Sequence, residues 1–299
     1  MNLSGHVPDR IFDAMSDPFG DIEDQSPQTP EELRTTLLGN TRRGYATLRK
    51  VFVQQPNTTG SRPSILGSMV NTRQETALRL LLLALALEAL KDEMLPPRRW
   101  TEILNTAHPC SPDQFTRALD QLEERKLLQR TGTNRLIGLT PLLEDGSGNA
   151  YTSPTAAGAD VGKGFFIIPN QAWTTGLIDN LRLPGLAMLL VTLHDTHQRP
   201  SFQVPLDKMP DWYGISERTA ERGYNELLAQ NVLLTRVQMV AAPRTPSGLR
   251  PITHRALADP YSKDAREALQ AGARARVRAQ NATTTAKVRK KRKKKGAKA

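Results

Sequence analysis

Apolar residues recur at helical spacing through the middle of the chain, and the first series of such segments begins near residue 72. Thr72–Met94 predicts a long apolar helix, and a shorter helix is predicted over Arg98–Thr106. A third helix is expected over Ser111–Lys126, because Ser111 is a suitable N-cap and Pro112 suits the first helical turn. Two extended segments separated by a Thr-Gly-Thr-Asn turn follow, so the sequence predicts three helices and then a β-hairpin.

A second series of segments repeats this order after residue 165. Helices are expected over Leu183–His197 and Ser216–Gln230, with a shorter helix between them and a short strand at Ser201–Val204. Leu233–Ala241 and Ile252–Leu257 are expected to pair as strands. Three helices followed by a hairpin is the winged-helix plan. Its repetition predicts a mainly α fold with small β-hairpins, built from two tandem winged-helix domains.

Composition sets the expected boundaries of these domains. Residues 1–33 contain eight acidic residues and one arginine, and residues 144–164 are rich in Gly, Ser, Thr and Ala. Such segments are typical of disordered ends and linkers. Helical patterns are expected near Pro30–Leu38, over Thr41–Val53 and over Ser262–Ala279. We therefore expect a disordered acidic segment over 1–40, a first domain with an N-terminal extension over 41–143, a linker over 144–164, a second domain over 165–260, and a basic helix with a disordered polybasic tail over 261–299.

The most informative stretch is Pro205–Leu234, which predicts a helix, a tight turn and a second helix. Gly214 can adopt the positive φ that ends a helix, Ile215 is suited to fill the angle between the two helices, and Ser216 is a suitable N-cap. Apolar positions on the second helix predict its buried stripe, which comprises Ala220, Tyr224, Leu227 and Leu228.

The opposite face of this second helix carries Arg218, Arg222 and Asn225. Arginine reads guanine and asparagine reads adenine in the DNA major groove, and either can hold a phosphate. We therefore expect this helix to enter the major groove, with Arg244 and Arg250 of the following hairpin on the flanking backbone. The alternative is an ordinary amphipathic helix with a solvated charged face. Glu217 and Glu221 on the same helix are compatible either with accepting from a cytosine amine or with repelling the DNA backbone.

Net charge is concentrated at the C-terminus. The chain has a formal charge of +11, and residues 287–299 supply nine Lys/Arg without an acid, so the rest carries 11 − 9 = +2. Such a tail binds polyanions by counterion release with little sequence preference. The expected DNA-binding residues there are Lys290, Lys291, Arg292, Lys293, Lys294 and Lys295.

The third helix of the first domain differs from its counterpart, because its outward face carries Asp113, Asp120 and Glu124 with Arg117. Phosphates would be repelled by such a face. We therefore expect the first domain to contact a partner or to form a homodimer rather than to read DNA.

Other classes of function find little support. Cys110 is the only cysteine, which argues against disulfides and Cys-based zinc sites and suits a reducing cytoplasm. His194 and His197 have helical spacing without further ligands, and Val161–Gly164 lacks the spacing of a phosphate loop. No apolar run is long enough to span a membrane, and no signal peptide is evident. We therefore expect no enzyme activity, no cofactor, no metal, no small-molecule ligand and no membrane contact.

The segment Trp212–Leu234 resembles the helix-turn-helix of bacterial winged-helix regulators. These commonly carry Gly, Ile or Val and Ser in the turn, then Thr-Ala/Val-x-Arg and Leu, as at Gly214, Ile215, Ser216, Thr219, Ala220, Arg222 and Leu227. The layout is also similar to winged-helix proteins of high-GC Gram-positive bacteria, in segments like Arg49–Val53, Glu144–Gly148 and Phe165–Trp173. The resemblance implies double-stranded DNA binding and adds Ser216 and Thr219 to the contact residues. Glu221 departs from the pattern within the reading helix.

Three roles remain open at this level. Transcriptional regulation is favoured; a plasmid or mobile-element replication initiator is the first alternative, because iteron-binding initiators also carry two winged-helix domains. A nucleoid-associated or chromosome-organisation protein, using winged helices as interaction modules, is the second. We expect a cytoplasmic protein associated with the nucleoid.

Deletion of residues 281–299 is expected to flatten the salt dependence of DNA binding while leaving sequence preference intact. Each phosphate neutralised on duplex DNA contributes about −0.9 to the slope of log K against log salt concentration. Fluorescence-anisotropy titrations at several salt concentrations measure both slopes. An unchanged slope would contradict a contribution from the tail, and a lost sequence preference would assign specificity to the tail itself.

Overall fold

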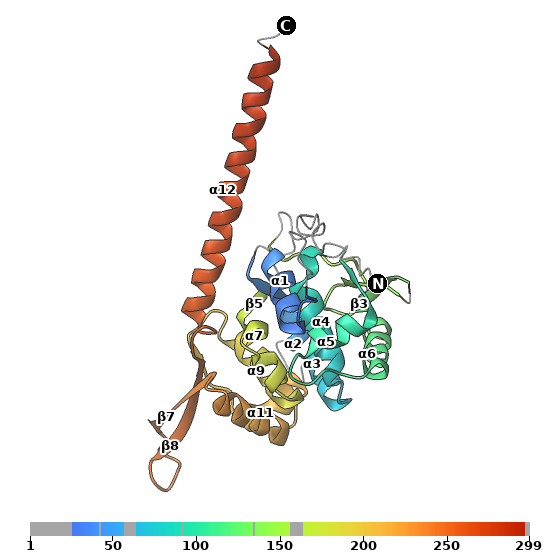
Figure 1. Ribbon diagram of the computed structural model, residues 1–299. Helices are drawn as coiled ribbons and strands as arrows, with labels where there is room; N and C mark the ends of the chain where they lie inside the picture. The colour runs from blue at the N-terminus through green and yellow to red at the C-terminus, as the bar shows by residue number, and fades with distance from the viewer. Residues whose placement is uncertain are drawn as a thin grey trace, which may run out of the picture.

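The computed structural model describes residues 26–41, 43–56, 64–90, 93–133, 135–155 and 164–296, with side chains up to residue 279. About half of the chain is helical, and the strands form small antiparallel sheets (Figure 1). The expectation for residues 1–25 concerns a segment that lies outside the described residues.

The first unit, residues 75–141, contains a helix, a strand, two helices and two strands in that order. A three-stranded antiparallel sheet has the order β2-β4-β3, so the first strand pairs with the last. The elements of the unit are α4 (Glu75–Ala86), β2 (Met94–Leu95), α5 (Pro97–Leu104), α6 (Pro112–Glu124), β3 (Leu128–Gly132) and β4 (Ile137–Pro141), with a short 3-10 turn, η1 (Glu88–Leu90), after α4.

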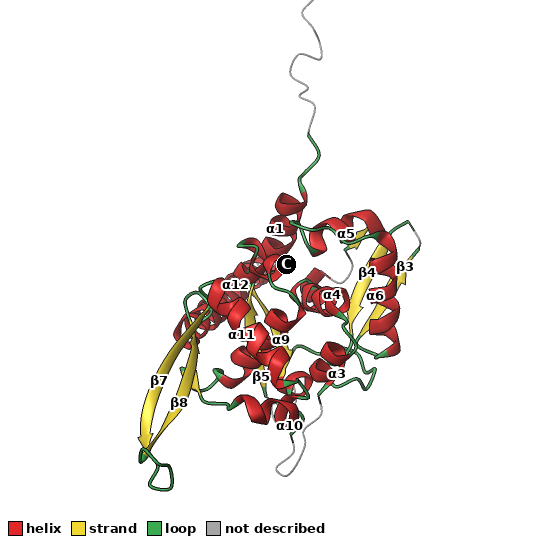
Figure 2. Cartoon of the chain, turned by 90° about the horizontal axis from the view of Figure 1, so that it is seen from below, coloured by secondary structure: helices red, strands yellow, loops and turns green. Residues whose placement is uncertain are grey.

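The second unit, residues 183–257, repeats this element order. Its sheet has the order β6-β8-β7, and again the first strand pairs with the last. The elements of the unit are α9 (Leu183–Asp195), β6 (Ser201–Phe202), η3 (Leu206–Lys208), α10 (Met209–Tyr213), α11 (Glu217–Ala229), β7 (Leu233–Ala241) and β8 (Leu249–Leu257). The hairpin formed by β7 and β8 extends away from the body of the protein (Figures 1 and 2).

Elements outside the two units join them into one body. β1 (Tyr45–Arg49) pairs antiparallel with β5 (Phe165–Pro169), and a single hydrophobic core runs through both units. All five residues of β1 are buried. The remaining helices are α1 (Pro30–Asn40), α2 (Lys50–Val53), α3 (Ile65–Asn71), α7 (Gln171–Thr174), α8 (Leu177–Asn180) and α12 (Lys263–Gly296).

A buried ion pair links the N-terminal helix to α8. The two Nη atoms of Arg34 donate to the two carboxylate oxygens of Asp179 at 2.8 and 2.7 Å, and both side chains are less than 5% exposed. The Asp179 carboxylate also accepts from Thr106 Oγ1, while its carbonyl accepts from Arg79 and Asn105. Side chains from three separate parts of the first half of the chain therefore meet at one aspartate.

Helix α12 is anchored to the body by its first turns. Arg266 is 3% exposed and donates to the carbonyl oxygens of Leu193 and Thr196 at the end of α9. Burial lowers the pKa of Arg266 to about 10. Farther along, Ala273 packs in a small cluster with Tyr45 and Ile167, and Arg276 donates to the carbonyl of Arg43.

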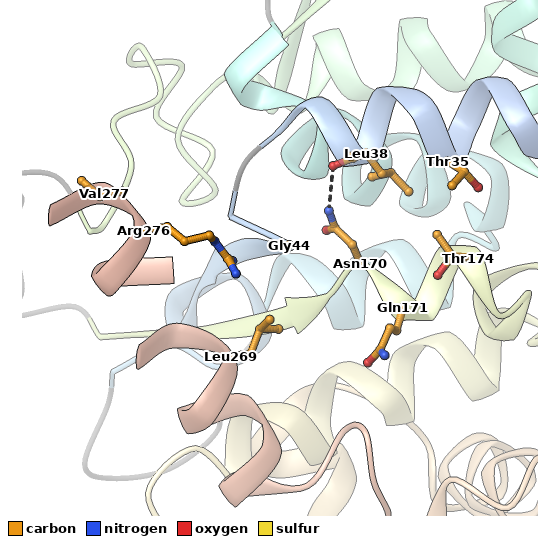
Figure 3. Close-up of a pocket in the computed structure, with 10 residues that line it drawn as sticks. Thr35, Leu38, Gly44, Asn170, Gln171, Thr174, Leu269, Arg276 and Val277 are labelled. Carbon is orange, nitrogen blue, oxygen red and sulfur yellow. Dashed lines mark hydrogen bonds between the residues drawn. The ribbon is translucent and has the colours of Figure 1, made fainter. Parts of the chain in front are cut away.

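A pocket of about 630 Å³ lies where α12 passes α1 and the start of α7 (Figure 3). Leu269 and Arg276 line it from α12, and Leu38 and Asn170 line it from the body. Asn170 Nδ2 donates to the Leu38 carbonyl at 3.3 Å, which ties the end of α1 to the end of β5. The packing between α12 and the body is therefore incomplete at this pocket.

Several predicted elements are wrong in type or extent. Thr41–Val53 was expected to be a helix, but most of it is β1 and the short α2, because β1 gains a partner strand about 120 residues away that local periodicity cannot reveal. Thr72–Met94 was expected to be one helix, but only its middle part, α4, is a long helix. Thr72–Gln74 forms the turn between α3 and α4, with Arg73 at φ +56°, and Met94 belongs to β2.

The expected ends and linker also differ from the structure. The helix expected near Pro30–Leu38 is present as α1, which has a complete capping box at Thr29 and Glu32 and buries Arg34. The disorder expected over 1–40 therefore does not extend to residues 30–40. The basic helix expected over Ser262–Ala279 is present as the first part of α12, and the helix continues through Gly296, in keeping with the helix propensity of its Ala, Arg and Lys residues. In the expected linker, Glu144 is fully buried and pairs with Arg49 at 2.6 Å.

Packing between α9 and α11 depends on a glycine. A Cβ atom at Gly223 would lie 2.2 Å from the Pro184 carbonyl oxygen and 2.5 Å from Met188 Cγ. Real Cβ atoms do not approach a backbone oxygen so closely, and a packed interior resists the displacement. Gly223 therefore sets how closely α11 lies against α9.

Gly223→Ala is expected to lower the free energy of unfolding by about 1–3 kcal/mol, because overpacking outweighs the roughly 1 kcal/mol that alanine gains in a helix. Urea denaturation measures the change. Gly39→Ala on α1 is the matched control, since a Cβ atom there would meet nothing within 4 Å, and it should be neutral or stabilising. Equal effects of the two substitutions would contradict the close-packing argument.

Candidate nucleic-acid interface

The predicted helix, tight turn and second helix are present as α10, residues 214–216 and α11. Gly214 ends α10 with φ +68° and ψ +21°, in the left-handed region, and Ile215 is fully buried. Ser216 caps α11, and its Oγ accepts from the backbone N–H of Thr219 at 3.2 Å. All three turn residues therefore act as the sequence predicts.

Helix α3 and its N-cap residue hold this turn by hydrogen bonds, which the sequence did not suggest. Ser64 Oγ donates to the carbonyl of Tyr213 at 3.1 Å, and Asn71 Nδ2 donates to the carbonyl of Gly214. A Cβ atom at Gly67 would lie 2.3 Å from the same Tyr213 oxygen. The turn is thus held by a helix that lies outside the second unit.

Helix α11 has the buried face and the exposed face that its sequence predicts, except at one position of the buried face. Ala220, Tyr224 and Leu227 are buried as expected. Leu228 was expected in the buried stripe but is 40% exposed, and Gly223 takes its place against α9. A stripe at i, i+3, i+4 and i+7 leaves Leu228 at the border of the buried face.

The outward face presents Arg218, Arg222 and Asn225, all exposed. Within the described part of the chain, no hydrogen bond or ion pair engages the guanidinium group of either arginine. Two acids, Glu217 and Glu221, share the exposed surface, and Glu217 lies in the first turn, where the helix dipole favours negative charge. The exposed arginines therefore remain available to an external acceptor.

The third carboxylate of α11 has a structural role. Glu226 Oε2 accepts from the backbone N–H of Arg182 at 2.9 Å, at the start of α9. Its charge is thereby directed toward the core contact with α9 rather than toward the outward face of α11.

Beyond α11, the hairpin region carries arginines without acids. Residues 227–258 contain four arginines and no aspartate or glutamate. Arg236, Arg244 and Arg250 are exposed. Arg236 and Arg250 lie on one face of the hairpin, because they fall on positions of the same parity in the β7–β8 register. Arg236 was missed by the sequence interpretation, although its place on a strand without acids was a usable signal.

Arg255 belongs to the opposite face and fixes the hairpin to α11. Its guanidinium carbon lies 4.2 Å from the centroid of the Tyr224 ring, and Nη1 donates to the Val204 carbonyl at 3.0 Å. One side chain therefore joins β8, α11 and the segment that precedes α10. The position of the hairpin relative to α11 depends on it.

Helix α6, which corresponds to α11 in the first unit, differs from α11 in its charge, and arginines of this unit are paired with carboxylates. Arg130 donates to Asp120 and Glu123, and these hydrogen bonds raise its pKa. Arg98 and Arg99 both pair with Glu102. These three arginines are thus occupied by neighbouring carboxylates.

A polar cleft of about 670 Å³ lies at the base of the hairpin, between β6, the end of α9 and α10. His194 Nδ1 lies 2.8 Å from Asp195 Oδ1, and Tyr213 donates to the same carboxylate. Burial lowers the pKa of Lys50 at one wall of the cleft, and the Asp195 charge opposes that shift. Among the residues described, no group of three or more His, Cys, Asp or Glu side chains is arranged to hold a metal ion.

The six tail residues that are predicted to bind DNA, 290–295, belong to α12, and their side chains fall outside the described part of the structure. No helix in the described part of the chain combines the length and apolar character needed to cross a membrane. Comparison of the chain with protein-family models, curated proteins and solved structures gave no match.

Arg255→Ala is expected to lower the free energy of unfolding by about 1–2 kcal/mol, the sum of a cation–π contact and a hydrogen bond. Arg250→Ala is the matched control on the same strand, since it is exposed, and should change stability by less than about 0.5 kcal/mol. Urea denaturation of both variants measures the difference. A neutral Arg255→Ala would show that the hairpin does not depend on this contact.

Proposed function

We propose that the chain is a sequence-specific double-stranded DNA-binding protein built from two tandem winged-helix domains, with the second as the DNA reader. The shared element order and sheet order of the two units support the fold assignment. The observation that carries the functional proposal is the exposed, unpaired Arg218 and Arg222 on α11 beside a hairpin region without acids.

In this proposal α11 lies in the major groove. Arg218, Arg222 and Asn225 contact base edges or phosphates, and the N-terminal turn with Ser216 and Thr219 lies against the DNA backbone. Arg244 and Arg250 hold the flanking backbone, and the polybasic residues of α12 add binding that is independent of sequence.

The first domain is assigned a contact with protein. Asp113, Asp120 and Glu124 on α6 would repel phosphates, and Arg130 is already paired. A partner or a second copy of the chain suits such a surface better than DNA does.

The biological role that we infer is transcriptional regulation in the cytoplasm, on the nucleoid. The repeated architecture also supports a replication initiator, in which both units serve one origin. A palindromic target favours the regulator, and direct repeats favour the initiator.

Random-oligonucleotide selection at about 150 mM salt, a condition under which non-specific binding is weakened, tests the proposal. The chain without residues 281–299 is expected to enrich a defined motif, and Arg218→Ala/Arg222→Ala in that background is expected to abolish it. Each lost base contact costs about 1–3 kcal/mol of discrimination.

Arg117→Ala, an exposed arginine on α6, is the matched control and should leave the motif unchanged. Binding that disappears with the tail and leaves no motif would contradict specific recognition. That outcome would favour the nucleoid-associated role, in which the tail dominates.

A further inference from the structure

Among the described residues, β7 forms an open edge of the second sheet. The sheet order β6-β8-β7 leaves β7 with a neighbour on one side only, and its register with β8 runs without a bulge from Leu233↔Leu257 to Ala241↔Leu249. Its sequence, LLTRVQMVA, contains no proline, lysine or acid, and Arg236 is its one charged residue. Natural proteins usually protect a long edge strand by one of these devices.

The main-chain groups on that edge can be assigned from the register. Ala242 N–H donates to the Gly248 carbonyl, and the Val232 carbonyl accepts from Ala258 N–H. Even-numbered residues of β7 therefore bond to β8, and the N–H and C=O groups of odd-numbered residues point toward the open edge. Thr235, Val237 and Met239 carry these groups at the centre of the strand.

Apolar side chains accompany this edge. Val237 is 60% exposed and Met239 is 55% exposed, and they lie on the same face of the strand. Leu234 is 55% exposed on the other face. An exposed edge strand that carries large apolar side chains is prone to pair with another strand.

We propose that β7 pairs antiparallel with β7 of a second copy of this chain, centred on Val237. In that register the central residue meets itself and no two like charges lie directly opposite each other. Val237 faces the partner's Val237, Met239 faces Thr235, Leu234 faces Val240, and Arg236 faces Gln238 rather than another arginine. Cross-strand pairs of these kinds are favourable, whereas like charges directly opposite are not.

The hydrogen bonding of this register is reciprocal. The Val237 pair exchanges two main-chain hydrogen bonds, and each Thr235–Met239 pair exchanges two more. The two three-stranded sheets would thereby become one six-stranded antiparallel sheet, with the two β7 strands at its centre. Edge pairing uses groups in the plane of the sheet, so both faces of each hairpin remain available.

Sedimentation velocity on nucleic-acid-free protein tests the proposal. The wild-type chain is expected to show a monomer–dimer equilibrium. Val237→Lys places two ammonium groups opposite each other, and Val237→Pro removes the central N–H without touching a bond to β8. Each should raise the dimer dissociation constant about tenfold or more, since about 1.4 kcal/mol corresponds to that factor.

Thr253→Lys is the matched control, because it adds the same charge on the same face, at the residue of β8 opposite Val237. In the dimer the two copies of this position are separated by three strand spacings, about 14 Å, beyond the screening length at 0.15 M salt. Its dissociation constant should change by less than about twofold, because charges at that separation are largely screened.

Cross-linking provides a second measurement in a Cys110→Ser background. Val237→Cys should form a disulfide-linked dimer on mild oxidation, because directly opposite residues bring their Cα atoms within disulfide range. Gln238→Cys should not, since its two copies are offset by two residues along the strands. A wild-type chain that sediments as a monomer at its highest soluble concentration overturns the proposal. So does a dimer that survives Val237→Lys, or equal cross-linking at the two positions.

Discussion

The ion pair between Arg34 and Asp179 is the contact on which the arrangement of the whole chain depends. A buried carboxylate is costly unless it is paired and its remaining lone pairs accept hydrogen bonds. Here both oxygens accept from Arg34, and Thr106 supplies a further donor. Removing either charged partner would leave the other buried and unpaired. These interactions therefore fix the position of α1 and of the end of α5 against α8.

The packing around Asp179 also helps to orient the surface that we propose to read DNA. Asp179 precedes α9 by only a few residues, and α9 supplies the surface on which α11 packs through Gly223. On the other side, α3 bonds directly to the turn before α11. The orientation of α11 is thus set by residues on both sides of the second unit. Tyr224 and Arg255 then carry this orientation to the hairpin.

Local sequence patterns predicted the elements whose determinants are local. Capping by Ser111 and Ser216, the left-handed Gly214 and the limits of β7 follow from residue type and short-range periodicity. β1 and the packed start of the linker were missed because their partners are distant in sequence. Tyr45–Arg49 is a strand only because Phe165–Pro169 lies beside it, and Glu144 is buried only because Arg49 faces it.

The same limit applies to the candidate interface. Residue spacing predicts which side chains of α11 face outward, and the structure places Arg218, Arg222 and Asn225 there. Spacing does not predict which cations are already paired. Arg130 and Arg255 look as available in the sequence as Arg222 does, yet one is held by Asp120 and Glu123 and the other stacks on Tyr224. What distinguishes a binding arginine from a structural one is the absence of an internal acceptor.

The two proposals, DNA contact and edge pairing, use different groups of the hairpin. Its side chains project from the faces of the sheet, whereas its open hydrogen-bonding groups lie in the plane of the sheet. Arg236 and Arg250 can therefore contact phosphates from a face while β7 pairs along its edge. An acid on either strand would weaken DNA contact, and a proline at an odd-numbered position of β7 would weaken edge pairing. The strand sequence contains neither, which is the pattern expected if the same protein uses both.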